Sequence, residues 1–250
     1  MGYMRKRWWC VRGCQVMEYH TRKSHPKGMK REGRSSPTSE QKQKANQREK
    51  ERHVQRLMMA NFGEDDKYIT LTYAKGREPG DFGQCQKDMK ALREHLGRIF
   101  RKAGRPLKWI QNIELTVRGI CHIHFLVNSL PGINVGRMVR EWWKGRHGAV
   151  VKVENTYLDG GFGKLAQYMA KTRRDKEGNL ISRFSRSRNL ADPEPEVREF
   201  SRWNVMDGNG WREVRIPKGY ELVKESVYEG VDLWTGFPYR YYTLLKQEGG

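Results

Sequence analysis

Apolar and polar residues alternate through several short runs of the chain, and the most informative run contains two histidines. His122 and His124 alternate there with Ile123, Phe125 and Val127. A period of two is typical of a strand, whose successive side chains point to opposite faces of a sheet. The pattern therefore predicts a strand that buries its three apolar side chains and places both imidazoles together on the other face.

Further runs predict the other elements of a small α+β domain. Strands are expected at residues 68–74, 109–115, 121–127 and 149–154, and helices at residues 84–103, 135–144 and 161–171. Up to residue 154 the order is strand, helix, strand, strand, helix, strand. This order predicts a ferredoxin-like (split β-α-β) antiparallel sheet with helices on one face. The other face would be left for functional groups.

Glu114 lies in the strand that precedes the histidine strand, and residues 117–120 form the turn between them. Antiparallel pairing brings Glu114 to the face of His122 and His124 if the turn holds an odd number of residues or a bulge, because a one-residue slip reverses the faces. Two imidazoles and one carboxylate suit a divalent ion that accepts nitrogen and oxygen ligands. We expect Mn²⁺ or Mg²⁺ at Glu114, His122 and His124.

Residues 161–171 predict a helix that is entered through glycines. Tyr168 and Lys171 are three residues apart and so share a helical face, as does Lys164, four residues before Tyr168. A tyrosine needs a neighbouring cation or metal ion to lower the cost of forming a phenolate, since its ordinary pKa is about 10. Tyr168 is therefore a candidate nucleophile with Lys171 beside it.

The ordered set of these residues resembles the motifs of the HUH endonucleases. Glu114 with His122 and His124, followed by Tyr168 and Lys171 and preceded by the strand at 68–73, is most similar to single-tyrosine rolling-circle replication initiators of plasmids, phages and integrative elements. The resemblance covers residues 66–175. It implies that the first strand, with Thr70 and Thr72, helps to bind DNA near the nick.

The resemblance also implies a function. Such an enzyme nicks and rejoins single-stranded origin DNA through a 5′-phosphotyrosine intermediate, and the free 3′-hydroxyl primes replication. A relaxase or transposase with the same chemistry, or a nucleic-acid-binding module that does not cut, is the alternative reading. Residues 160–165 lack the pattern of a phosphate-binding ATPase loop, so a separate helicase and the host polymerase are expected as partners.

The net charge supports a polyanionic partner. The chain carries 49 basic and 29 acidic residues, a formal charge of +20, which favours nucleic acid, both single-stranded and duplex. No stretch approaches the roughly 18 apolar residues that span a bilayer. The N-terminus lacks the apolar core of a secretory signal, so a cytoplasmic protein of a bacterial host is expected.

Composition divides the chain into three expected parts. Residues 1–63 form a basic arm with a helix at about 38–60 and a possible cap at Ser39, residues 64–178 form the nuclease domain, and residues 179–250 form a β-rich extension. Residues 1–60 hold sixteen basic and five acidic residues, which favours an arm that grips nucleic acid, with a solvated disordered tail as the alternative.

Isolated side chains complete the set of candidates. The residues expected to contact DNA phosphates are Lys164, Arg173, Arg174, Arg186 and Arg188. Cys10 and Cys14 with His20 and His25 are spaced more closely than in a classical zinc finger, so zinc binding there is a minority alternative to reduced thiols.

Overall fold

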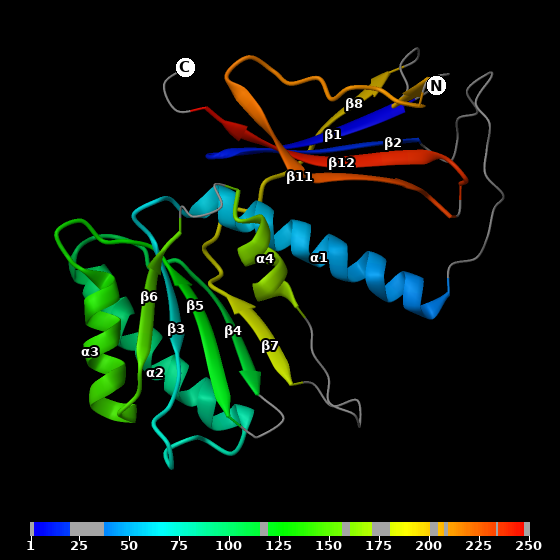
Figure 1. Cartoon of the computed structure of the whole chain (residues 1–250). Coiled ribbons are helices and arrows are strands. Elements are labelled where there is room, and N and C mark those ends of the chain that lie inside the picture. The colour runs from blue at the N-terminus through cyan, green and yellow to red at the C-terminus, as the bar shows by residue number, and fades with distance from the viewer. Residues whose placement is uncertain are drawn as a thin grey trace. The chain divides into compact units, whose positions relative to one another are not determined.

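The computed structural model describes residues 3–20, 38–115, 120–156, 161–171, 181–200, 205–207, 210–233 and 235–247 (Figure 1). The chain divides into two compact units. One unit is Lys50–Ala191, and the other combines Met1–Glu49 with Asp192–Gly250. Predicted site residues from Thr70 to Arg188 all belong to the first of these units, which we call the central unit.

A five-stranded antiparallel sheet forms the basis of the central unit. Its elements in chain order are β3 (Lys67–Leu71), α2 (Phe82–Lys102), β4 (Trp109–Leu115), β5 (Cys121–Val127), α3 (Val135–His147), β6 (Val151–Asn155), α4 (Gly163–Ala170) and β7 (Ser182–Arg186). The strand order is β6-β3-β5-β4-β7, with every pair antiparallel. The first four strands have the order of a ferredoxin-like sheet, so the predicted α+β fold is confirmed.

The hydrophobic core of the central unit lies between the sheet and the helices α2 and α3. Ile123, Phe125 and Val127 of β5 are fully buried in it, together with Leu92 of α2 and Trp143 of α3. Both helices therefore cover one face of the sheet, as the alternation of β5 predicts. Burial of these side chains stabilises the strand orientation, because reversing the faces would expose each of them at a cost of about 1.5–3 kcal/mol.

The hairpin of β4 and β5 has the register that the sequence left conditional. Glu114 is directly opposite His122, and Asn112 is directly opposite His124. Directly opposed residues of an antiparallel pair point to the same face. Glu114 and both histidines therefore share the face that α2 and α3 do not cover.

Helix α1 (Ser39–Asn61) belongs to one unit up to Glu49 and to the central unit from Lys50 onward. Thr38, rather than Ser39, caps it: the Gln41 amide donates to Thr38 Oγ1 (3.2 Å), and the Gln41 side chain accepts from the Thr38 amide (2.8 Å). This reciprocal capping box satisfies two donors. The buried residues of α1 fall between Val54 and Met59, within the segment of the helix that belongs to the central unit.

The other unit contains a second antiparallel sheet. Its strands are β1 (Tyr3–Cys10), β2 (Gly13–His20), β8 (Glu196–Phe200), β11 (Tyr220–Val231) and β12 (Pro238–Lys246), in the order β11-β12-β2-β1-β8. A two-stranded sheet pairs β9 (Met206–Asp207) with β10 (Gly210–Trp211). The sequence places β1 and β2 in the expected N-terminal arm, and β8, β11 and β12 in the expected C-terminal extension. It does not predict that these strands form one sheet, because pairing between segments some 200 residues apart leaves no local signal.

Candidate active site

The face of the sheet opposite α2 and α3 carries the predicted ligands. Glu114 and His124 are 5% and 4% exposed, and His122 is half-buried. Thr70 of β3 is directly opposite His124, on the far side from β4. Three neighbouring strands thus bring one carboxylate, two imidazoles and one hydroxyl to a single patch.

Tyr168 contacts the second histidine of this patch. Its hydroxyl lies 3.0 Å from Nε2 of His124, and the two rings meet edge to face with centroids 4.6 Å apart. Tyr168 is 39% exposed, whereas His124 is almost fully buried. The phenol is therefore reachable from solvent and held against the sheet at the same time.

The start of α4 fixes this tyrosine. Phe162 precedes the helix with φ of 58°, a left-handed conformation that a bulky residue rarely adopts and that costs of order 1–3 kcal/mol. Its side chain is 2% exposed, so burial offsets this cost. Gln55 of α1 donates to the Gly161 carbonyl (2.8 Å) just before it. The entry to α4 is thus anchored by packing rather than by a capping side chain.

The predicted helix runs through Lys171, whereas α4 ends one residue earlier, at Ala170. Lys171 is the C-cap with φ of −59° and ψ of 123°, outside the helical region, and it is exposed. Its carbonyl accepts a hydrogen bond from Ser182 Oγ (3.0 Å), and Ser182 is directly opposite Glu114 in β7. This contact ties the end of α4 to the strand beside Glu114.

Two further residues belong to the site. Tyr68 donates to, or accepts from, Nδ1 of His124 at 2.8 Å, and burial raises the pKa of its phenol above the ordinary value. Asn112 is fully buried beside Glu114, with Nδ2 3.5 Å from Oε1 of that carboxylate, and its own Oδ1 is a buried oxygen without a hydrogen-bond partner in the described part of the chain.

Sequence reasoning did not select Tyr68 or Asn112 as site residues. The signal was present, because Tyr68 and Asn112 are each two residues away from a selected residue, Thr70 and Glu114. A period of two places such residues on one face.

The contacts of His124 bear on the expected binding of a metal ion. Within the described residues, no three His, Cys, Asp or Glu side chains form a group that could hold a metal ion as they stand. Both ring nitrogens of His124 are in contact with tyrosine hydroxyls. His124 can ligate an ion through Nε2 only after Tyr168 gives up its contact.

The expected DNA-binding residues are dispersed over the central unit. Thr72 Oγ1 donates to the Val150 carbonyl (3.0 Å), while Lys164 and Arg188 are exposed and Arg186 is half-buried at the end of β7. Arg173 and Arg174 lie outside the described residues.

The possible zinc residues lie in the other unit. Cys10 of β1 and Cys14 of β2 are thiols that form no disulfide within the described residues. Burial raises the pKa of Cys14 to about 12, which disfavours the thiolate that binds zinc. His20 packs against the rings of Tyr3 and Phe237. His25 lies outside the described residues.

Part of the chain matches a known protein family. The model of a family described as replication-associated protein ORF2/G2P matches residues 66–173, a segment that includes Glu114, His122, His124, Tyr168 and Lys171. No curated protein and no solved structure matches the chain. The similarity supports a role in DNA replication, consistent with a replication initiator. None of the helices in the described segments has the length and hydropathy needed to cross a membrane.

Proposed function

We propose that this protein nicks and rejoins single-stranded origin DNA, with Tyr168 as the nucleophile, to start rolling-circle replication. The observation that carries the proposal is the contact of the exposed Tyr168 hydroxyl with His124, on the sheet face where Glu114 is directly opposite His122. The family match over residues 66–173 supports the role in replication.

The reaction is a transesterification. The Tyr168 oxygen forms a bond to phosphorus while the bond from phosphorus to the 3′-oxygen breaks, and the phenol proton is passed on so that the leaving oxygen ends as a hydroxyl. The product is a 5′-phosphotyrosine and a free 3′-hydroxyl. Reversal by a 3′-hydroxyl restores the phosphodiester, because the phosphotyrosine keeps the energy of the bond.

The chemical types of these donors suit a divalent ion, and binding one would require the side chains to converge further than they do as they stand. Glu114, His122 and His124 supply one oxygen and two nitrogens, and the unpartnered Oδ1 of Asn112 is a further hard donor beside them. These residues would hold Mn²⁺ or Mg²⁺. When bound, the ion would polarise the scissile phosphate and stabilise charge on its non-bridging oxygens.

Four further residues would position the DNA strand at the site. DNA would contact Thr70 of β3, Thr72 just after β3, and the exposed cation Lys164. Lys171 would offset negative charge where α4 meets β7. A separate helicase would unwind the origin, and a host polymerase would extend the 3′-hydroxyl.

A covalent adduct tests the proposal. The full chain is incubated with Mn²⁺ and a mixed-sequence pool of single-stranded oligonucleotides, one batch labelled at the 3′ end and one at the 5′ end. The adduct on a denaturing gel should carry the 3′ label, because the downstream fragment keeps the 5′-phosphate. Tyr168→Phe should abolish the adduct, whereas Tyr220→Phe in the other unit should keep it. An adduct that persists in Tyr168→Phe would overturn the assignment.

A further inference from the structure

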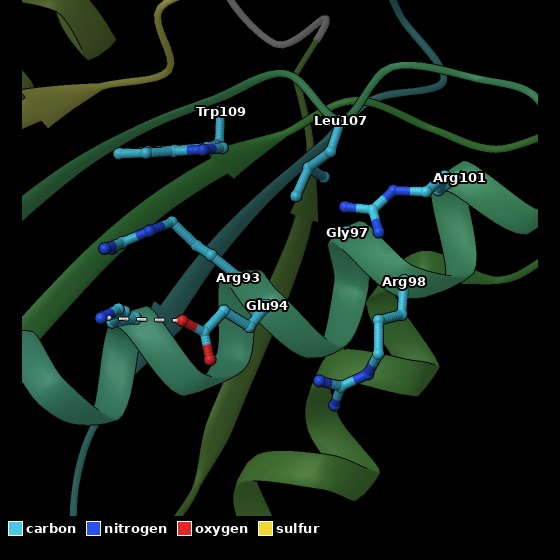
Figure 2. A pocket seen from close by; sticks show the side chains of 8 residues that line it. Arg93, Glu94, Gly97, Arg98, Arg101, Leu107 and Trp109 are labelled. Atoms are coloured by element: carbon cyan, nitrogen blue, oxygen red, sulfur yellow. Dashed lines mark ion pairs between the residues drawn. The ribbon is translucent and has the colours of Figure 1, made fainter.

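A basic groove of about 480 Å³ runs between α2 and the start of β4 in the central unit (Figure 2). Its walls are Lys90, Arg93, Arg98 and Arg101 of α2, with Leu107 and Trp109 on the opposite side. It adjoins a second hollow of about 390 Å³, which shares Arg101 and adds Arg105. Together they form an open basic track rather than a closed cavity.

The charge of this track is nearly all positive. Glu94 is the only acidic residue among the residues that line either hollow, and its carboxylate lies 3.8 Å from Lys90 Nζ. Lys90, Arg98, Arg101 and Arg105 are exposed. Since like charges repel, four exposed cations along one track are stabilised by a bound polyanion.

Arg93 and Trp109 form the fixed part of the groove. The Arg93 guanidinium lies 4.4 Å from the centroid of the Trp109 ring, and Figure 2 shows the two planes stacked. Arg93 Nη1 also donates to Gln111 Oε1. Because Arg93 is held by the ring and the amide, it presents its remaining N–H donors in a fixed direction, which lowers the entropy cost of binding a phosphate.

Gly97 keeps the floor of the groove open. It lies inside α2, where glycine costs about 0.5–1 kcal/mol of stability relative to alanine. A Cβ at Gly97 would meet no atom within 4 Å, and its φ lies outside the left-handed region. Neither packing nor backbone conformation therefore requires glycine at this position, whereas a ligand in the groove would benefit from the space.

The groove lies on the helix-covered face of the sheet. Trp109 and Gln111 alternate along β4 with Asn112 and Glu114 in the register of the β4–β5 pair, so the two sets point to opposite faces. A ligand in the groove consequently occupies a different surface from DNA at Tyr168.

We propose that this groove is a second nucleic-acid contact, which holds the phosphodiester backbone of DNA on the sheet face opposite Tyr168. Guanidinium forks match phosphate oxygens, and the open, elongated track fits a chain of phosphates better than a single small anion. The proposal does not depend on Tyr168 being a nucleophile.

Charge reversal with a matched control tests this site. Arg98→Glu/Arg101→Glu in the full chain is compared with Arg140→Glu/Lys144→Glu, which makes the same change in charge at exposed positions of α3. Fluorescence anisotropy measures binding of a labelled duplex and of a labelled single strand over a range of salt concentrations. The groove variant should bind at least one of them about tenfold more weakly, with a salt slope reduced by about 2. If only the duplex or only the single strand loses affinity, that form of DNA is the one whose backbone binds in the groove.

Gly97→Leu provides a test without a change of charge. It should fold at least as well as the natural chain and still bind DNA several-fold more weakly, because the side chain fills the floor of the groove. Equal loss of affinity in both double variants, or full DNA affinity in Gly97→Leu, would overturn the proposal. So would unchanged DNA binding with loss of binding to labelled poly-glutamate, which would indicate a protein partner. Adduct formation on short oligonucleotides is measured in parallel, so a failure of the nicking chemistry stays distinct.

Discussion

The Tyr68 hydroxyl lies 2.8 Å from Nδ1 of His124, at the ring nitrogen that does not face Tyr168. A neutral imidazole has one N–H donor and one acceptor nitrogen. When one tyrosine donates to the ring, the ring can therefore donate to the other. Tyr68 thereby fixes both the orientation of His124 and the nitrogen that it offers to Tyr168.

Tyr68→Phe should disturb His124 without removing it. Loss of a hydrogen bond that orients a ligand typically costs about 10–100-fold in metal affinity or activity, and we expect a change of this size in the rate of adduct formation and in Mn²⁺ affinity measured by calorimetry. Tyr73→Phe is the control, since it loses a hydrogen bond to Asp88 (2.9 Å) on the helix-covered side. Equal effects of the two variants would show that Tyr68 has only a structural role.

Asn112→Leu should separate stability from ion binding. Asn112 is fully buried with an unpartnered Oδ1, and an unsatisfied buried polar group costs about 1–3 kcal/mol. Replacing the amide by an apolar group of similar volume should leave the free energy of unfolding unchanged or raise it, while Mn²⁺ affinity falls. A variant that gains stability and keeps full Mn²⁺ affinity would argue against a role of Asn112 in the site.

His147 should make the central unit less stable in weak acid. Burial, followed by the charges of Arg146 and Arg77, lowers the pKa of its imidazole below the ordinary value of 6.5, although Asp88 acts in the opposite direction. As the pH falls below 6.5, the unfolded chain binds a proton that the folded chain does not. The stability contribution is therefore complete above pH 6.5 and is lost as the pH falls through the folded-state pKa.

Chemical denaturation over pH 5–8, in the titration range of histidine, measures this effect. In His147→Gln the slope of unfolding free energy against pH should be smaller. Part of the slope should remain, because burial also lowers the pKa of His95, and the double variant His95→Gln/His147→Gln should remove that part. An unchanged slope in the double variant would contradict the prediction.

Glu18→Gln should destabilise the unit that contains the second sheet. Glu18 is fully buried and accepts from Arg5 Nε (2.7 Å), Arg240 Nη2 (2.9 Å) and the Tyr242 hydroxyl (3.2 Å). Removing the carboxylate charge takes the buried ion-pair partner from Arg5 and the nearer of two carboxylates from Arg240, whose Nη1 lies 3.8 Å from Glu229. Breaking a buried ion pair in this way costs about 3–5 kcal/mol.

The matched control is Glu141→Gln. It breaks the exposed ion pair between Arg137 and Glu141 (2.7 Å), which should change the unfolding free energy by less than about 1 kcal/mol. A loss in Glu18→Gln no larger than in Glu141→Gln would mean that the buried network contributes little net stability.

The sequence by itself determined the elements of the central unit and the faces of its strands. Alternation of His122 and His124 with Ile123, Phe125 and Val127 allows only one orientation that buries the apolar side chains, so both imidazoles had to share the other face. Helical spacing likewise fixed α2 and α3. These signals are local, because each depends on the period of one element.

Only the tertiary structure decided which elements meet. The position of Glu114 opposite His122 depends on the register of a hairpin, and the contact between Tyr168 and His124 depends on how α4 packs on the sheet. Tyr68 gained its partner 56 residues away in the same manner. Pairing of β12 with β2 joins segments more than 200 residues apart. Such contacts follow from burial and hydrogen bonding over the whole chain, and no periodicity within a single segment encodes them.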